Sequence, residues 1–158
     1  WVVNLDELKS EYHKTQNTEL IQAIVKAQYG LIAYYIGSKE KRKAASELEL
    51  AEQYLDLLIS KFPNDKKYLA YNGAFLGFEM GIYPWKLFYL GPQSQNYILE
   101  AFNNSPETHE ANFEYANMLF WAPAIVGGDK EKSLIYYKKT ITLLEQKNQK
   151  PGRFCKSR

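Results

Sequence analysis

The sequence predicts an all-α fold, a right-handed α-solenoid of about seven helices that includes three helix pairs. Apolar residues recur at steps of three and four along most of the chain, as in Leu48, Ala51, Leu55 and Leu58, which places them on one face of a helix. The alternation of apolar and polar residues that strands require is nearly absent. Similar residues also return after 43 positions, and a period of this size is typical of helical-repeat proteins.

The 43-residue period is marked by small, proline and aliphatic residues. The recurring positions are Gly30, Gly73 and Ala116, then Pro63 and Pro106, and then Leu55, Ile98 and Ile141. A small residue in a helix allows a second helix to cross with its backbone close by. We therefore expect three successive copies of one helix pair, with Gly73 at the crossing point of the second copy.

The expected elements follow from apolar stripes and from residues that cap helix starts. Leu5, Leu8 and Tyr12 form the stripe of a short first helix. Each later first helix, and the last helix, follows a residue whose side chain can accept a hydrogen bond from the first turn, namely Asn17, Asp65, Ser105 and Asp129. The expected order is Leu5–His13, then Thr18–Ile36 paired with Lys41–Phe62, Lys66–Met80 with Gln93–Asn103, and Pro106–Trp121 with Lys130–Gln146.

The chain length fits one domain. Its 158 residues can bury a core without the help of disulfides. We expect residues 1–146 to form a single helical-repeat domain. Residues 147–158 are basic and lack apolar periodicity, so we expect them to form a frayed tail.

Composition excludes several classes of protein. Twenty basic and eighteen acidic side chains leave a formal charge of +2, which is too balanced for a nucleic-acid-binding surface. A mean hydropathy of -0.46 and the lack of a long apolar run argue against a membrane-spanning segment. With one cysteine and two histidines in the chain, we expect no metal and no cofactor.

The sequence also lacks motifs for catalysis. It has no G-x-S-x-G, G-x-x-x-x-G-K-[ST] or G-x-G-x-x-G motif, so we expect that the protein is not an enzyme. Glu107, Glu110 and Glu114 fall on one side of a predicted helix. We expect them to form a solvated acidic face rather than a catalytic pair.

The helix pairs carry motifs of a known family. The segment Leu69-x2-Asn72-Gly73-x2-Leu76 places a small residue midway along a first helix. The second helices carry Ala51-x3-Leu55…Pro63, Ser94-x3-Ile98…Pro106 and Ser133-x3-Tyr137. From Thr18 to Gln146 the chain resembles the tetratricopeptide-repeat family, which implies a superhelix with a concave binding face. That family has a period of about 34 residues, and a HEAT-like repeat of roughly 40–47 residues is the alternative.

A second resemblance concerns the turn before the last helix. The run Pro123-Ala124-Ile125-Val126-Gly127-Gly128-Asp129 is similar to small extracytoplasmic bacterial helical-repeat proteins, among them the T component of tripartite (TRAP-type) importers. This resemblance implies a bacterial, periplasmic protein. The chain starts at Trp1 and not at methionine, so any export signal or lipoprotein cysteine would lie in a part that has been removed, and with the resemblance this favours an extracytoplasmic location. A cytoplasmic location is the alternative.

Aromatic residues recur at one position of the repeat. Tyr35, Phe78 and Trp121 each lie five residues after the small residue of their copy. Five residues rotate a helix by about 140° net, away from the helix crossing. We therefore predict a concave groove that binds a partner and is lined by Tyr34, Tyr35, Phe78, Asn117, Phe120 and Trp121. The alternative is that these rings pack into the core.

The stretch from Tyr83 to Leu90 is rich in aromatic residues, namely Tyr83, Trp85, Phe88 and Tyr89. A monomer rarely exposes such a patch without a function. We expect the stretch either to fold over the helices as a lid or to form an interface with a partner or a second subunit.

The expected groove and the missing catalytic motifs together predict a non-enzymatic interaction module that binds a peptide or a partner protein. The importer resemblance implies an alternative, a small-ligand-binding accessory subunit of an extracytoplasmic uptake system. The oligomeric state stays open at this point.

Overall fold

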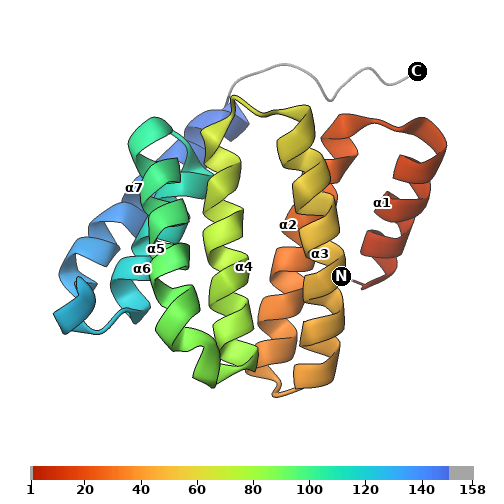
Figure 1. Ribbon diagram of the computed structural model, residues 1–158. Coiled ribbons are helices and arrows are strands. Elements are labelled where there is room, and N and C mark those ends of the chain that lie inside the picture. The colour runs from red at the N-terminus through yellow and green to blue at the C-terminus, as the bar shows by residue number, and fades with distance from the viewer. Residues whose placement is uncertain (1, 150–158) are drawn as a thin grey trace.

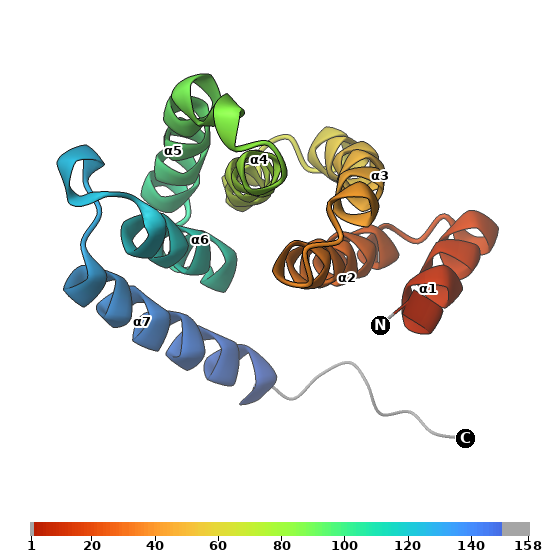
Figure 2. The ribbon, with the colours of Figure 1, turned by 90° about the horizontal axis from the view of Figure 1, so that it is seen from below.

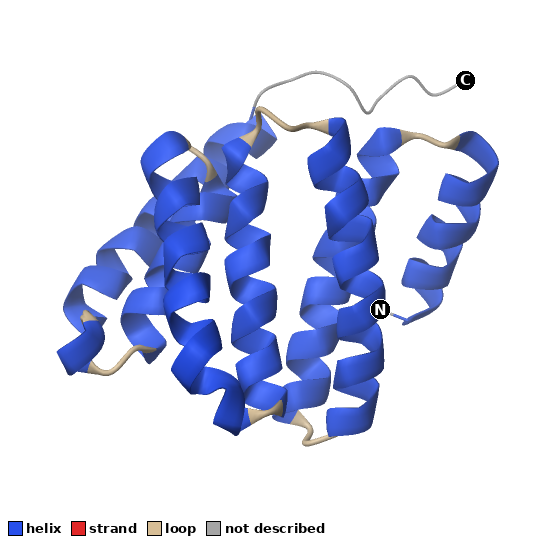
Figure 3. Cartoon of the chain, in the orientation of Figure 1, coloured by secondary structure: helices blue, strands red, loops and turns tan. Residues whose placement is uncertain are grey.

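The structure, a computed structural model, describes residues 2–149, and within this range it contains helices and no strands (Figure 1, Figure 3). The α-helices are α1 (Val2–Thr15), α2 (Thr18–Gly37), α3 (Lys41–Lys61), α4 (Leu69–Ile82), α5 (Leu87–Asn104), α6 (His109–Trp121) and α7 (Lys130–Gln149). Short 3₁₀ helices over Lys66–Tyr68, Pro84–Lys86 and Ala124–Val126 precede α4, α5 and α7. The predicted all-α class is confirmed. The handedness and the solenoid arrangement stay predictions.

Some helix boundaries differ from the predicted ones. Helix α5 begins at Leu87 instead of Gln93 and contains Pro92. The sequence suggested a break there, but a proline near a helix start forfeits only one backbone bond, in this case to the carbonyl of Phe88. Helix α6 begins after the N-cap Thr108, later than the predicted Pro106. Helix α7 runs to Gln149, and the rest of the predicted tail lies outside the described residues.

The helices pack as the three predicted pairs, α2 with α3, α4 with α5, and α6 with α7. Helix α1 packs on α2, and the first helices of successive pairs also touch, α2 with α4 and α4 with α6. Figure 2 shows α3 and α5 on the outer side and α7 along the side of α6 that faces away from α5. Helices α2, α4 and α6 therefore form a common inner layer.

The crossing of α4 and α5 is as close as the sequence predicts. A Cβ atom at Gly73 would lie 2.4 Å from Ile98 Cγ1 and 2.9 Å from the backbone oxygen of Ser94. The hydroxyl of Ser94 also donates a hydrogen bond of 2.7 Å to the carbonyl oxygen of Gly73. Only glycine fits this contact, so the predicted role of Gly73 is confirmed.

The hydrophobic core is unevenly distributed. One large cluster fills the space between α1, α2, α3 and α4, where Ile21, Leu55 and Phe75 are fully buried. Around α5, α6 and α7 the apolar clusters are small, and several polar side chains are buried, namely Glu110, Asn112, Glu114, Ser133 and Thr140. Buried polar groups need partners, so this half of the molecule is where a functional site is expected. None of the helices described between residues 2 and 149 is long and apolar enough to cross a membrane.

Candidate functional site

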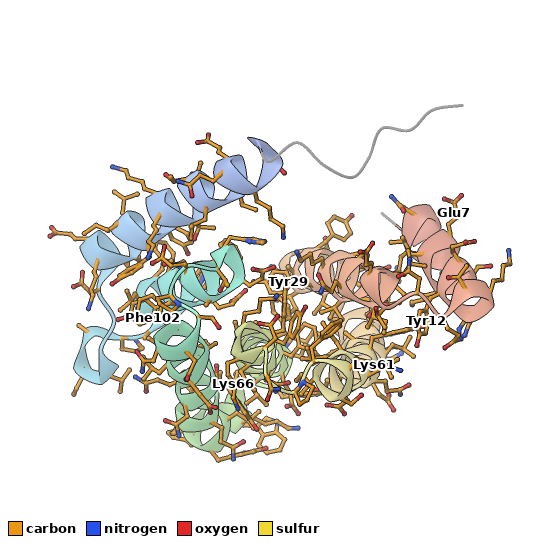
Figure 4. The ribbon with its side chains drawn as sticks, turned by 90° about the horizontal axis from the view of Figure 1, so that it is seen from above. Glu7, Tyr12, Tyr29, Lys61, Lys66 and Phe102 are labelled. Atoms are coloured by element: carbon orange, nitrogen blue, oxygen red, sulfur yellow. The ribbon has the colours of Figure 1, made fainter. Side chains whose placement is uncertain are left out.

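A pocket of about 210 Å³ opens between four helices on the inner side of the molecule. Its lining comes from α2 (Lys26, Tyr29), α4 (Tyr71), α6 (His109, Glu110, Phe113, Glu114) and α7 (Thr140, Leu144). Tyr29 lies in the space framed by α2, α4 and α6 (Figure 4). The first helix of each pair contributes to the lining, so the pocket is formed by equivalent helices of the three repeats.

Aromatic rings form the walls of the pocket. The ring of Tyr29 lies 6.2 Å from that of Tyr71, 6.3 Å from that of Phe113 and 4.8 Å from that of Phe78, centroid to centroid. Phe113 in turn lies 6.0 Å from the ring of Tyr137 on α7. Such tilted and edge-to-face pairs fix one another in place, so the walls are preorganised for an aromatic or apolar ligand group.

A hydrogen-bonded cluster lies behind the rings. The amide of Asn117 donates to the carboxylate of Glu114 at 3.1 Å and to the hydroxyl of Tyr29 at 3.3 Å. The hydroxyl of Tyr137 donates to the amide oxygen of Asn117 at 2.7 Å. Asn117 therefore joins three helices through their polar side chains.

Glu114 is the buried acid of this cluster. Burial raises its pKa to about 7, although hydrogen bonds from Asn117 and Tyr29 act in the opposite direction. Burial also raises the pKa of Tyr29 and of Tyr71, and the nearby carboxylates add to both shifts. Near neutral pH, this part of the pocket therefore holds a carboxyl group that is only partly ionised.

Charged groups surround the pocket on one side. The ammonium group of Lys26 lies 3.1 Å from one carboxylate oxygen of Glu110, and Nδ1 of His109 lies 3.0 Å from the other. Burial alone would raise the pKa of Glu110, but the hydrogen bond from His109 and the charge of Lys26 lower it to about 2. Burial and repulsion from Lys26 lower the pKa of Lys147, near the end of α7.

The expectation of a solvated acidic face on α6 is wrong for two of its three residues. Glu110 and Glu114 are buried, and only Glu107 is exposed. Helix α7 packs along α6, and its side chains Thr140 and Leu144 share the pocket lining with both buried carboxylates. A surface pattern on one helix could not reveal this cover, because it comes from the next helix.

The structure places the predicted groove residues in different surroundings. Phe78 contacts Tyr29, and Asn117 belongs to the hydrogen-bonded cluster, so both adjoin the pocket. Tyr35 packs against the large core cluster. Tyr34, Phe120 and Trp121 are exposed near the ends of α2 and α6, and the rings of Phe120 and Trp121 pack edge-to-face.

Sequence inspection missed the three rings that line the pocket. Tyr29, Tyr71 and Phe113 lie 42 residues apart, one fewer than the period of the small residues. The ring therefore lies one, two and three residues before the small residue in the first, second and third copies. A search for aromatic residues at neighbouring periods would have found them.

The Tyr83–Leu90 stretch forms the 3₁₀ helix before α5 and the first turn of α5 itself. Tyr83, Trp85, Phe88 and Tyr89 are exposed, and Leu90 alone of its large side chains is buried. None of these residues lines the pocket. The stretch lies where α4 joins α5, at one end of the molecule (Figure 1).

Comparisons with known proteins show a fold and no family. No family model and no curated protein matches the sequence. Among solved structures, the chain is similar to the HusA haemophore from Porphyromonas gingivalis, with a TM-score of 0.64 and 16% sequence identity, over 95% of this chain and 73% of that chain. At this identity the likeness establishes a shared helical fold, and the ligand has to be argued from the site.

Proposed function

We propose that this protein is a non-enzymatic binding protein whose pocket takes part of a flat, aromatic, anionic small molecule of the porphyrin class. The observation that carries the proposal is the convergence of Tyr29, Tyr71 and Phe113 from three helices beside the ammonium group of Lys26. The shared fold with a protein named a haemophore supports this ligand class. The proposal takes up the small-ligand alternative that the sequence left open.

The contacts available in the pocket suit one edge of a planar ring system. Aromatic walls offer edge and face contacts to a π-system, and their own packing leaves little rotamer entropy to lose on binding. A pocket of about 210 Å³ is smaller than a whole porphyrin needs, so the rest of the ligand extends from the mouth. There the ammonium groups of Lys26 and Lys147 can pair with its carboxylates.

For a ligand that carries a metal ion, His109 is the imidazole in the pocket lining that could bind the metal. Its Nδ1 is held by the carboxylate of Glu110, an arrangement that fixes the ring and leaves Nε2 to bind a metal. We therefore expect His109→Gln to weaken binding of haem and to leave binding of metal-free protoporphyrin unchanged.

The test is a titration with protoporphyrin IX, followed by absorbance and by quenching of protein fluorescence. Phe113→Ala removes a pocket wall and is expected to weaken binding roughly tenfold or more. Phe88→Ala is the matched control, because it removes an exposed ring of the same kind outside the pocket. Equal affinities for the two variants, or no saturable binding by the unmodified chain, would overturn the proposal.

The carboxylates of the ligand provide a second arm of the test. Lys147→Gln is expected to weaken binding of protoporphyrin IX several-fold, since it removes one ammonium group. Binding of the dimethyl ester of the same porphyrin should not change, because the ester has no negative charge to lose. If Lys147→Gln weakened binding of the porphyrin and of its dimethyl ester equally, Lys147 would not pair with the ligand carboxylates.

The size of the pocket favours a second candidate, the peptide or partner protein that the sequence predicted. About 210 Å³ accommodates a single large side chain of a peptide better than most free small molecules. This candidate predicts that peptides with one aromatic residue beside an acidic one bind, and that Phe113→Ala abolishes their binding. It gains support only if protoporphyrin IX fails to bind.

We also propose an extracytoplasmic location for the protein. The fold shared with a haemophore supports it, as does the similarity of the turn at Pro123–Asp129 to extracytoplasmic helical-repeat proteins. The residues encoded upstream of Trp1 provide the test, because an export signal or a lipoprotein motif is expected there. An initiator methionine directly before Trp1 would contradict the location.

A further inference from the structure

Three turns at one end of the molecule expose large apolar side chains. The turns join α2 to α3, α4 to α5 and α6 to α7, and all three lie at the lower end in Figure 1. Trp85, Phe88, Trp121 and Ile125 are 65%, 88%, 77% and 92% exposed there. We call this end the turn surface, and Tyr34, Leu87 and Val126 also belong to it. Exposure on this scale is rare in a monomer and marks a surface that meets an apolar partner.

Each of the three turns also carries a lysine above an aromatic ring. The ammonium group of Lys43 lies 5.5 Å from the ring centre of Tyr35, that of Lys86 lies 5.5 Å from Trp85, and that of Lys130 lies 5.5 Å from Phe120. Lysines in this position keep their charge in water while their carbon chains cover the ring. The pairing of rings with cations is therefore a repeated property of the turn surface.

The charge of the turn surface is positive. Its basic side chains are Lys39, Lys41, Arg42, Lys43, Lys86, Lys130 and Lys132, and its acidic ones are Glu40, Glu79, Asp129 and Glu131. Glu40 pairs with Lys43 and Glu79 pairs with Lys86, so these two ion pairs add no net charge and the other five basic side chains face Asp129 and Glu131. The side chain of Asp129 accepts a hydrogen bond from the first turn of α7 at 2.9 Å. The basic groups that remain attract an anionic partner.

The first two turns lie against each other. A Cβ atom at Gly81, near the end of α4, would lie 3.6 Å from Ile36, near the end of α2. Figure 1 shows the third turn at the same end of the molecule, beyond α5 from the first turn. The turns therefore form one extended surface.

We propose that the turn surface docks onto an anionic lipid bilayer. Tryptophan and tyrosine are enriched at membrane interfaces, and basic side chains beside them are attracted by negatively charged lipid headgroups. Insertion of the protruding rings would bury their apolar area, while the lysines remain at headgroup level. This surface is separate from the pocket, so the proposal does not depend on the porphyrin ligand.

The positive charge of the turn surface favours an anionic lipid bilayer as its partner over a second copy of the chain. Two turn surfaces facing each other would bring their basic side chains together, and this repulsion opposes a symmetric dimer. An anionic bilayer can bury the apolar side chains of the turn surface and attract its basic side chains. It does so without needing a rigid surface of complementary shape.

Cosedimentation with lipid vesicles tests the proposal. The chain is expected to bind vesicles that contain phosphatidylglycerol and phosphatidylcholine, to bind vesicles of phosphatidylcholine alone much more weakly, and to lose affinity as salt rises. The double variant Phe88→Asp with Ile125→Asp is expected to lower the partition coefficient roughly tenfold or more. Both side chains are almost fully exposed, so the variant keeps its fold.

The matched control is Ile141→Asp, which places the same charge at an exposed isoleucine on α7. It is expected to bind vesicles like the unmodified chain. An equal loss in the control and the double variant, or no dependence on anionic lipid, would overturn the proposal. So would light scattering that shows a dimer which the double variant disrupts, or capture of a defined acidic protein by the turn surface without lipid binding.

Discussion

The pocket and the turn surface use the same aromatic residue types in opposite ways. In the pocket, Tyr29 packs against three other rings, and its hydroxyl group accepts a hydrogen bond from Asn117. On the turn surface, Phe88 and Trp121 protrude and lysines lie above neighbouring rings. An aromatic content of 15% therefore does not by itself indicate whether these residues form a binding pocket or an exposed surface. Burial and ring contacts separate the two sets, since the pocket rings pack on one another and Phe88 and Trp121 are exposed.

The electrostatics of the two regions also differ. The pocket contains two buried carboxyl groups: burial raises the pKa of Glu114, whereas His109 and Lys26 lower the pKa of Glu110. On the turn surface, charged groups are exposed and mostly basic, so solvent screens them. Ligand selection in the pocket should depend on pH, and attraction at the turn surface should depend on salt.

The largest expected contrast between the regions is in stability. Phe75 is fully buried behind the pocket and packs with Tyr71 and Phe78. Phe75→Ala is expected to lower the free energy of unfolding by about 3–5 kcal/mol, because it leaves a cavity. Phe88→Ala is expected to change it by less than about 0.5 kcal/mol. Urea denaturation followed by circular dichroism measures both, and similar losses would show that the exposed ring is packed in solution.

A second contrast runs along α4, from its crossing with α5 toward the turn surface. Gly73→Ala places a Cβ atom against Ile98 and the Ser94 backbone, and we expect a loss of about 1–3 kcal/mol. One turn later, Gly77 has no atom within 4 Å of the position of a Cβ. Gly77→Ala should therefore stabilise the protein by up to about 1 kcal/mol, because alanine favours a helix. Thermal unfolding measures the stability of both variants. If both substitutions changed the stability in the same direction, the close helix crossing at Gly73 would be contradicted.

The third prediction concerns the buried carboxyl group of Glu114. Its pKa is about 7 in the folded protein and near 4.5 in an unfolded chain, so the folded state binds the proton more tightly. The contribution of this group to stability is present below about pH 4.5 and is lost as the pH rises through 7. One pKa unit corresponds to about 1.4 kcal/mol. Unfolding curves at several pH values between 5 and 8 should therefore show stability falling by roughly that amount or more.

The control for this prediction is Glu114→Gln, which keeps the shape and removes the titration. The titratable groups that interact with Glu114 are Tyr29 on α2, Tyr71 on α4 and Tyr137 on α7, and Glu110 lies one turn earlier on α6. The tyrosines have raised pKa values and stay neutral in this range, and Glu110, with a pKa of about 2, titrates well below it. The variant should have a flatter pH profile than the unmodified chain. An unchanged slope would mean that Glu114 is solvated.

The smallest expected effect is at Trp121, which the sequence placed in the groove. Its ring is exposed and packs on Phe120, so Trp121→Ala should change the free energy of unfolding by less than about 0.5 kcal/mol. Affinity for protoporphyrin IX should stay within about twofold, because the residue does not line the pocket. A tenfold loss would instead support a groove at the positions five residues after the small ones.

The helices and their pairing could be predicted because local signals determine them. Asn17 accepts a hydrogen bond of 2.9 Å from the amide of Glu19 and caps α2 as expected. Asp129 accepts one from the amide of Lys132 at the start of α7. The prediction that Ser105 caps a helix starting at Pro106 is wrong, because the chain makes one further turn there and α6 begins after Thr108. Errors of this kind shift a boundary without changing the fold.

The pocket could be predicted only in part. That the first helices would line it followed from the repeat, and Phe78 and Asn117 do adjoin it. The sequence did not predict how many residues separate each lining ring from the small residue of its copy. This separation depends on how far each helix pair is rotated relative to the next pair. The burial of Glu110 and Glu114 depends on the path of α7, which no pattern within α6 encodes.

The hydrogen bond between Asn117 and Tyr29 joins residues 88 positions apart in the chain. Most other helix contacts connect sequence neighbours, as in the packing of α1 on α2 and of α2 on α3. Local contacts form quickly during folding, and closing a long loop costs additional entropy. The pairs should therefore assemble one after another as the chain leaves the ribosome, and the pocket should close only when α6 and α7 arrive. The complete pocket is then the last feature that the nascent chain forms and the first that fraying of α7 removes.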